Sequence, residues 1–412
     1  MSRPATLLTM RALVSEGPER LALREVATPR PGPGEVLVRV LVALTCATDF
    51  KIARRGHPKF PFPLTLGHEF AGVVAEAGSG APFAPGERVT SAVSGPCGGC
   101  DDCRRGRENL CATAFEKPLF GAFADFLLVP ERIVKNALRK IPPALSDEAA
   151  ALLDPLASVV HALNRVNALG GTQGGCDVLV VGTGPIAAMM FFLLRGREEG
   201  RERERAGYGD VRRIVVAGRR EKKLRFFLER GASIARIVGS SREPQPAPPR
   251  PPFTFEENAP APPRIEISPR DPGAAAPNPL FTFEEDPAEP SRIESTRGEG
   301  ARFSLILDTT GDAGVIAELP ALTADGGTVL LFAGMPEGAR VSVDAFALHY
   351  REVSITGSFH YTPRDVDTAL ALLAGGAIPV GSLVGEMRAL AQWREAFDLV
   401  ERGAAMKVAL VP

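Results

Sequence analysis

The sequence predicts an α/β protein in two parts, a β-barrel unit followed by a doubly wound parallel sheet. Three observations predict this class. Short apolar alternations broken by Gly and Pro fill residues 10–140, and a regular succession of apolar strands and helices begins near Cys176. The third is the composition, because 412 residues that are 45% hydrophobic and 24% charged are typical of a globular chain with two or more domains.

The first part is expected to consist of short strands. The runs E-V-L-V-R-V-L-V, from residue 35, and A-G-V-V-A-E-A-G, from residue 71, are separated by a stretch that contains Gly and Pro. Regularly spaced short strands with turn residues between them indicate an all-β, barrel-like unit. A helix over 146–170 is expected next, because Ser146 suits its N-cap and Glu148 places an acid in its first turn.

The second part is expected to be a parallel sheet with helices. D-V-L-V-V at 177–181 is a continuous apolar strand of the buried, parallel type, and an apolar helix follows it. Further strands are predicted at 213–217, 304–310 and 327–333, with a helix ending near Arg230 between the first two. This alternation indicates a doubly wound fold. The tail after residue 358 is expected to pack back on the first part.

Two segments interrupt this alternation. Residues 195–210 carry a run of mixed charge, which predicts a solvated helix extension or a loop. Residues 240–300 hold 15 of the 37 prolines and contain a repeat, since P-F-T-F-E-E-N at 252–258 returns as L-F-T-F-E-E-D at 280–286. So many prolines exclude regular sheet or helix, so we expect a duplicated, disordered insertion, either passive or a docking segment.

The charge balance excludes several classes of partner. The formal net charge is -1 and the sequence pI is about 6.6, so nothing points to nucleic acid or to an anionic membrane. The longest apolar run, 185–194, is too short to span a bilayer. The N-terminal residues lack the apolar segment and cleavage site of a signal peptide, which favours a cytoplasmic protein.

Four of the six cysteines form a C-x2-C-x2-C-x7-C run at Cys97, Cys100, Cys103 and Cys111. Disulfides are rare in the cytosol, and the last spacing differs from that of common bacterial iron–sulfur proteins. Four thiolates this close together can complete a tetrahedral shell around one zinc ion. The run therefore favours a structural zinc site.

A second set of metal-binding residue types lies upstream. Cys46 stands in T-C-A-T-D, and His68 and Glu69 stand in L-G-H-E-F. A thiolate, an imidazole and a carboxylate leave one position of a zinc shell open for another oxygen. One closed sulfur site beside one mixed site suggests a structural zinc next to a working one, and thus two zinc ions per chain.

A dinucleotide-binding turn is predicted directly after the strand at 177–181. Gly182 permits a tight turn, Gly184 lets the backbone approach a pyrophosphate, and Ala187 completes the G-x-G-x-x-A pattern. Pro185 and Ile186 open the helix, whose N-terminus favours negative charge. The alternative is a tight strand-to-helix turn without a ligand.

The next strand favours NADP(H) over NAD(H). An acidic residue after this strand would bind the ribose 2′-hydroxyl of NAD, but Gly218 stands there. Arg219 and Arg220 follow and suit a 2′-phosphate. The alternative is that both arginines simply face solvent at the start of the next helix.

Taken together, these motifs resemble the zinc-dependent medium-chain dehydrogenase/reductase family, in its sorbitol (iditol), threonine and sugar-alcohol dehydrogenase branch. The resemblance covers nearly the whole chain apart from the two insertions. The motifs that carry it are T-C-A-T-D-F-K (45–51), G-H-E-F-A-G (67–72), the four-cysteine run, D-P-L-A-S-V-V-H-A (154–162), G-T-G-P-I-A (182–187) and T-G-S-F-H-Y-T-P (356–363).

The resemblance implies a GroES-like β-barrel catalytic domain and a Rossmann cofactor domain. We expect the catalytic domain at 1–155 with a zinc lobe near 95–112, the Rossmann domain at 156–357, and a C-terminal return at 358–412. It also implies a zinc-dependent enzyme that moves a hydride between NAD(P) and a secondary alcohol, a polyol or the corresponding ketone. Dimers and tetramers are the family's usual assemblies.

The resemblance also assigns roles to residues. Cys46, His68, Glu69 and Asp154 match the positions that hold the catalytic zinc, and Thr48 matches a hydroxyl that relays a proton outward. Lys407 matches a position that contacts the cofactor's phosphates. Three residue changes depart from the usual pattern. Asp154 is one methylene shorter than the usual Glu and reaches zinc directly or through water, Ala47 replaces a Gly, and Lys51 stands where some alcohol dehydrogenases have a relay histidine.

Two other functions stay open at this point. A biosynthetic NADPH-dependent carbonyl reductase of a specialised metabolite would use the same site. A non-catalytic scaffold that binds a partner through the repeated insertion is a different class of function, and the intact Cys46, His68 and Glu69 set argues against it.

Overall fold

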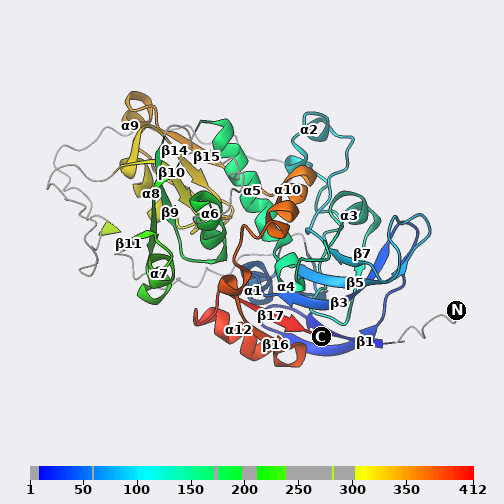
Figure 1. Ribbon diagram of the computed structural model, residues 1–412. Helices are drawn as coiled ribbons and strands as arrows, with labels where there is room; N and C mark the ends of the chain where they lie inside the picture. Colours follow the sequence, from blue (N-terminus) through cyan, green and yellow to red (C-terminus); the bar gives the residue numbers. More distant parts are fainter. Residues whose placement is uncertain (1–8, 58–59, 171–174, 197–210, 238–280, 283–301) are drawn as a thin grey trace.

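The computed structural model describes residues 9–57, 60–170, 175–196, 211–237, 281–282 and 302–412. The described residues form two parts that meet along a long helix (Figure 1). One part is a mostly antiparallel barrel-like sheet built from both ends of the chain, and the other is a parallel sheet flanked by helices.

The barrel-like part contains two sheets. A seven-stranded sheet has the order β16-β17-β3-β5-β6-β8, with β7 paired to β3, and a three-stranded sheet has the order β2-β1-β4. The strands are β1 (Thr9–Ser15), β2 (Leu21–Ala27), β3 (Val36–Leu44), β4 (Leu64–Thr65), β5 (Glu69–Ala77), β6 (Arg88–Thr90), β7 (Phe126–Val129), β8 (Arg139–Lys140), β16 (Val384–Ala389) and β17 (Lys407–Val411).

The second part is a parallel sheet with one antiparallel edge. Its order is β12-β11-β10-β9-β13-β14-β15, which is the 3-2-1-4-5-6 order of a Rossmann fold with β12 added at one side. The strands are β9 (Cys176–Val181), β10 (Val211–Gly218), β11 (Ser233–Ile237), β12 (Phe281–Thr282), β13 (Phe303–Asp308), β14 (Thr323–Leu331) and β15 (Ser354–Gly357).

Helices cover both faces of the parallel sheet and close the ends of the barrel (Figure 1). The helices are α1 (Ala47–Arg55), α2 (Asp101–Arg104), α3 (Glu131–Asn136), α4 (Asp147–Ala150), α5 (Leu153–Ala168), α6 (Pro185–Arg195), α7 (Glu221–Leu228), α8 (Ala313–Leu322), α9 (Ala345–Tyr350), α10 (Pro363–Ala374), α11 (Val380–Leu383) and α12 (Trp393–Glu401). Two short 3-10 helices are η1 (Glu108–Leu110) and η2 (Leu390–Gln392).

The burial of β9 shows why its sequence is continuously apolar. Val178 and Val180 belong to the large core that also contains barrel residues, whereas Leu179 and Val181 belong to a second core on the other face of the sheet. Both faces of the strand are therefore covered, as in parallel sheets generally. The same large core includes Phe70 of the barrel and Phe191 of α6, so the two parts share one apolar interior.

Most of the predicted elements are confirmed. The strands expected from residues 35, 71, 177, 213, 304 and 327 correspond to β3, β5, β9, β10, β13 and β14. The helix expected over 146–170 occurs as two helices, α4 and α5, and the Ser146 hydroxyl accepts a hydrogen bond from the backbone N–H of Ala149 as its N-cap. The tail does return to the first part, since β17 pairs with β3.

The two insertions lie largely outside the described residues. Of the charged run, only the end of α6 at Arg195 and the following Gly196 are described. Within 240–300, only β12 is described, and its two residues pair antiparallel with β11. All helices among the described residues are too short or too polar to cross a bilayer.

Candidate functional site

Strand pairing brings the mixed metal-binding set together. Cys46 follows the end of β3 and precedes α1, while His68 and Glu69 stand at the start of β5. In the antiparallel β3–β5 pair, Leu44 lies opposite Glu69, so the two segments meet at one end of the sheet. The potential ligand atoms of Cys46, His68 and Glu69 all lie within 4.8 Å of one another.

A glycine and an aspartate fix the imidazole of His68. Gly67 has φ +89°, and a Cβ there would lie 2.6 Å from the backbone nitrogen of Phe123, so this position requires glycine. Asp49, on the first turn of α1, accepts hydrogen bonds from the Gly67 N–H (3.0 Å) and from Nδ1 of His68 (3.2 Å). The other imidazole nitrogen, Nε2, is thereby left for a ligand. Asp49 thus orients both the His68 ring and the turn that precedes it.

Glu69 is held on one side only. Its side chain is 1% exposed, and its Oε2 accepts a hydrogen bond from the ammonium of Lys407. Its Oε1 is buried and has no hydrogen-bond partner among the described residues. A buried carboxylate oxygen without a partner is costly, and a bound cation would relieve that cost. This orphaned oxygen fits a metal ion at the site.

The charges of the site act strongly on one another. Burial lowers the pKa of His68, but the negative charges of Asp49 and Cys46 outweigh burial and raise it well above its usual value. Burial raises the pKa of Glu69 more than the positive charges of Lys407 and His68 lower it. Burial disfavours the charged form of Lys407, yet Glu69 and Cys46 raise its pKa. These opposing effects show how closely the charged groups of the site are coupled.

The structure places Lys407 differently from the expectation. The resemblance assigned it to the cofactor's phosphates, but its side chain is 3% exposed, and its ammonium donates to Glu69 and to the carbonyl oxygen of Thr45 (3.2 Å). Lys407 is thus a member of the buried metal-binding region. Its sequence neighbourhood, A-M-K-V-A-L-V, carries no sign of this pairing, because Glu69 lies 338 residues earlier.

Asp154 lies beside this region without joining the ligand set. It is on the first turn of α5, and its Oδ1 accepts hydrogen bonds from the N–H of Val93 (2.8 Å) and from the hydroxyl of Tyr361 (2.8 Å). The cluster of mutually close ligand atoms contains Cys46, His68 and Glu69 only. The shorter Asp side chain is therefore occupied by protein partners.

The four-cysteine cluster lies on a lobe of loops, α2 and η1. The potential ligand atoms of Cys97, Cys100, Cys103 and Cys111 lie within 4.8 Å of one another, and none of these cysteines is in a disulfide. The backbone N–H groups of Gly99 and Cys100 point at the Cys97 sulfur and lower the pKa of that thiol to about 6. Burial raises the pKa of Cys103 to about 12. The lobe thus brings together four sulfurs at the spacing a closed metal shell requires.

The lobe is tied to the segment that precedes α10. The amide of Asn109 donates to the carbonyl oxygen of Phe359 (3.0 Å), and the N–H of Ser94 donates to the hydroxyl of Tyr361 (3.2 Å). The Ser94 hydroxyl is hydrogen-bonded to Nε2 of His360, a residue with a left-handed backbone (φ 61°). The sequence analysis did not identify Ser94 or Tyr361, because the residues that join them to the site are distant in sequence.

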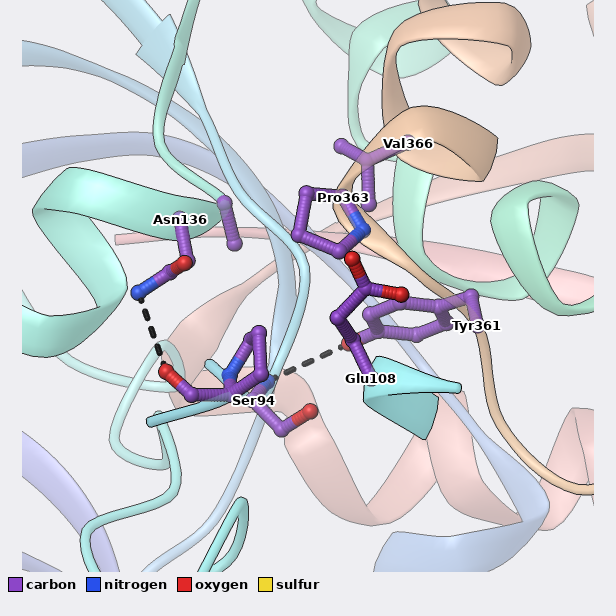
Figure 2. A pocket seen from close by; sticks show the side chains of 8 residues that line it. Ser94, Glu108, Asn136, Tyr361, Pro363 and Val366 are labelled. Atoms are coloured by element: carbon purple, nitrogen blue, oxygen red, sulfur yellow. Dashed lines mark hydrogen bonds between the residues drawn. The ribbon is translucent and has the colours of Figure 1, made fainter. Parts of the chain in front are cut away.

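Figure 2 shows the small hollow at this junction, with Tyr361 and Ser94 joined by a hydrogen bond and Glu108 close to Tyr361 and Pro363. It has no room even for a water molecule. Small-molecule sites usually have volumes of about 300–1,000 Å³. The hollow therefore belongs to the packing between lobe and core. The labelled residues around it are Ser94, Glu108, Asn136, Tyr361, Pro363 and Val366.

The predicted dinucleotide turn has the required backbone. Gly182 has φ +121°, and a Cβ there would clash with the hydroxyl of Thr309. Gly184 is the N-cap of α6, Pro185 is its first residue, and a Cβ on Gly184 would meet no atom within 4 Å. Open space at this point lets a ligand approach the helix N-terminus. Ala187 is fully buried, as the close packing of helix on strand requires.

The two arginines follow the end of β10. Gly218 ends the strand, and a Cβ there would clash with Thr183. Arg219 is half-exposed and pairs with Asp312 at 2.6 Å, whereas Arg220 is the N-cap residue of α7 and lies against Gly403. An incoming 2′-phosphate would compete with Asp312 for Arg219.

Three further polar residues, Thr48, His57 and His161, have different surroundings. Thr48 is exposed on the first turn of α1, next to Cys46. His57 stacks on Phe60 with ring centroids 4.3 Å apart. His161 is paired to Asp365 at 2.8 Å, which gives it a packed, structural role.

Comparison with known proteins finds similar dehydrogenases. Residues 32–141 match the family model of the alcohol dehydrogenase GroES-like domain. The L-threonine 3-dehydrogenase of Rhizobium johnstonii is 35% identical over 243 residues, which are 57% of this chain and 63% of that protein. A zinc-binding dehydrogenase from Sinorhizobium meliloti 1021, bound to NADP, is 26% identical and superposes with a TM-score of 0.71 over 98% of this chain and 99% of its own. Residues 32–141 are thus an alcohol dehydrogenase GroES-like domain, and nearly the whole chain is similar in fold to a zinc-binding dehydrogenase.

The fold class therefore agrees with the prediction, and the similar proteins are dehydrogenases of the kind that the resemblance implied. An alcohol dehydrogenase from Thermus sp. ATN1 supports the same assignment, at 26% identity and a TM-score of 0.70 over 98% of this chain and 99% of that one. The chain matches less than two thirds of the length of the curated relatives, 63% of the Rhizobium johnstonii protein and 50% of the L-threonine 3-dehydrogenase of Coxiella burnetii. Activity and substrate are treated below as proposals.

Proposed function

We propose that this protein is a zinc-dependent oxidoreductase that transfers a hydride between a nicotinamide cofactor and a secondary alcohol or polyol, or the corresponding ketone. The observation that carries the proposal is the set of half-buried Cys46 with buried His68 and Glu69, which includes one orphaned carboxylate oxygen. The same chain presents a glycine turn at the N-terminus of α6 that suits a dinucleotide.

The donor atoms suit zinc better than a hard cation. A thiolate and an imidazole select zinc among common divalent ions, and one carboxylate oxygen completes a three-ligand set. Cys46, His68 and Glu69 would hold the ion, with Asp154 outside the set. Bound zinc supplies Lewis-acid chemistry, which lowers the pKa of an alcohol or polarises a carbonyl.

The chain's own residues position the ligands and move the proton. Asp49 keeps His68 in one orientation, and the same carboxylate fixes the turn at Gly67. Thr48, which is exposed and lies two residues after Cys46, would accept the substrate's hydroxyl proton at its own hydroxyl and pass it to water. Lys51 lies on the same helix and is exposed, so it offers no buried relay of the histidine type.

The cofactor would bind along the turn from β9 to α6. Gly182, Gly184, Pro185, Ile186 and Ala187 would hold the pyrophosphate, and the nicotinamide supplies the hydride acceptor or donor when bound. We infer a preference for NADP(H), because Gly218 offers no carboxylate and Arg219 and Arg220 offer two cations. The Sinorhizobium meliloti relative is described with NADP, which is in keeping with this preference.

The four-cysteine lobe would hold a second zinc ion with a structural task. Its four sulfurs leave no position for a substrate. Two zinc ions per chain follow from this assignment. Iron in place of zinc in the lobe would contradict it.

Three broader assignments complete the proposal. We place the catalytic domain at 1–155 and 358–412, and the cofactor domain at 156–357. A homodimer or homotetramer is proposed on the basis of the family, and a cytoplasmic location on the basis of its small-molecule chemistry. A carbonyl reductase acting on a specialised metabolite shares every residue of the site, so only substrates distinguish it from a polyol dehydrogenase.

The test is a substrate screen with metal analysis on the full chain. NADPH or NADH oxidation would be followed over a panel of ketones and ketoses, and NADP⁺ or NAD⁺ reduction over alcohols, polyols and L-threonine, the substrate that names the curated relatives. We expect activity with a secondary alcohol or its ketone, faster with NADP(H), and two zinc ions per chain. Fewer zinc ions would contradict the two-site assignment, and no turnover with any member of the panel would contradict the proposed reaction.

A further inference from the structure

Lys407 is a charged side chain enclosed inside the metal-binding region. Its residue is 2% exposed, and it comes from β17, hundreds of residues after the ligands it meets. Its ammonium donates to Oε2 of Glu69 and to the carbonyl oxygen of Thr45, the residue before Cys46. One cation thus touches both segments that carry the metal ligands.

The sheet explains how this contact arises. Strands β17, β3 and β5 are neighbours, with Ala409 opposite Leu44 and Leu44 opposite Glu69. Thr45 is clamped to β17 by two further hydrogen bonds, one to the N–H and one to the carbonyl oxygen of Val408. Lys407 therefore reaches past β3 to the carboxylate on β5 from a rigid base.

This contact makes the two carboxylate oxygens of Glu69 different from each other. The oxygen Oε2 is engaged by Lys407, and the oxygen Oε1 has no partner among the described residues. Glu69 can thus offer one oxygen to a cation while the ion pair with Lys407 persists. Offering both would leave a buried ammonium with only a carbonyl oxygen for a partner, which is costly.

The charge balance of the region agrees with this division. Cys46, Asp49 and Glu69 contribute three negative charges as ligands and supports, and Lys407 contributes one positive charge. A divalent cation would offset most of the negative charge gathered there, as a buried site requires. If Lys407 lost its charge, a mobile carboxylate with two free oxygens would face a divalent ion.

We propose that Lys407 is a positioning residue that restrains Glu69 to one-oxygen coordination and so keeps a coordination position open for the substrate. This inference rests on the metal site of the proposed function. It assigns Lys407 to the metal rather than to the cofactor. Without Lys407, both oxygens of Glu69 turn to the metal and fill the position that an external ligand would occupy.

The experiment uses the full chain loaded with Co²⁺ and titrated with azide, a small ligand that needs an open coordination position. The Cys46→Ala variant retains any absorption from the four-cysteine cluster. Subtracting its spectrum therefore isolates the absorption that depends on Cys46. The variants are Lys407→Met and the charge-preserving Lys407→Arg. Lys140→Met is the matched control, because Lys140 is an exposed lysine paired with Glu87.

We expect azide to bind Lys407→Met about 10- to 100-fold more weakly than the unaltered chain, the usual range for losing a residue that supports a metal ligand. Lys407→Arg and Lys140→Met should keep azide binding. The double variant Lys407→Met with Glu69→Gln should regain it, because an amide does not chelate as a carboxylate does. Circular dichroism and thermal unfolding show that each variant is folded.

The outcomes separate two failures. If the unaltered chain shows no Cys46-dependent, azide-sensitive spectrum, the proposed metal site is wrong and this inference falls with it. If that spectrum is present and Lys407→Met binds azide as the unaltered chain does, only the role of Lys407 is wrong. Weak azide binding that the double variant does not restore would likewise overturn the restraint on Glu69.

Discussion

The two cysteine-bearing sites of this chain are assembled in opposite ways. The four-cysteine cluster takes all its ligands from fifteen consecutive residues on a partly exposed lobe, and backbone N–H groups support its sulfurs. The Cys46 site takes its ligands from the ends of two paired strands and its supporting residues from α1 and β17. A closed site can thus be built locally, whereas an open, buried one needs the whole sheet to hold each ligand.

The largest expected effect comes from removing the single sulfur of the mixed site. Cys46→Ser should lower turnover on the order of 10³-fold or more, because a Lewis acid supplies several kcal/mol of transition-state stabilisation. Metal analysis should show one zinc ion lost and one retained. Loss of both ions at once would mean that the two sites are not independent, against the comparison above.

Removing a sulfur from the four-cysteine cluster should affect the free energy of unfolding more than the turnover rate. Cys103→Ser removes a buried sulfur from the lobe, and losing a structural metal costs several kcal/mol of folding free energy. Urea unfolding should show the loss, while turnover of the remaining folded protein falls less than tenfold, on the order of 1 kcal/mol. Cys176→Ala, at a buried cysteine outside both clusters, is the control. Equal losses of turnover in Cys103→Ser and Cys46→Ser would remove the distinction between the two sites.

A smaller effect should report on the junction between the sites. Tyr361→Phe removes the hydroxyl that donates to Asp154 and accepts from the N–H of Ser94. Losing a buried hydrogen bond and leaving its partner unsatisfied costs about 1–3 kcal/mol. Thermal unfolding should show a loss in this range, with both zinc ions retained. Loss of the catalytic zinc in Tyr361→Phe would show that Asp154 contributes to metal binding after all.

A last effect, which appears only at acid pH, concerns the segment that joins the lobe. Burial lowers the pKa of His360 from 6.5 to about 4, so the folded protein keeps the ring neutral while the unfolded chain protonates it. This contribution to stability is complete above pH 6.5 and is lost as the pH falls toward about 4, by at most about 1.4 kcal/mol per pH unit. Asparagine tolerates the left-handed backbone at this position. Urea unfolding between these pH values should show that the free energy of unfolding of His360→Asn depends less on pH than that of the unaltered chain. If the free energy of unfolding of His360→Asn changed with pH as steeply as that of the unaltered chain, the role given to His360 would be wrong.

Local pattern predicted most of the architecture. The apolar run of β9, the glycines after it and the cysteine spacing each depend on neighbours within a few residues, and each was identified from sequence. The partners of Glu69 and Asp154 were not, because Lys407 and Tyr361 reach them only through strand order and the packing of the segment before α10. The family position of Lys407 pointed to the cofactor, whereas its geometry points to the metal.

The place of β17 in the sheet has a consequence for biosynthesis. During translation, Cys46 and Glu69 leave the ribosome long before Lys407, which contacts the carbonyl of Thr45 across 362 residues. Domains usually fold as they emerge, N-terminal part first. Here the first part must wait for the last strand, so its ligands stay incompletely held while the entire cofactor domain is made. Chaperone binding or early zinc capture in that interval would protect a site that cannot yet be finished.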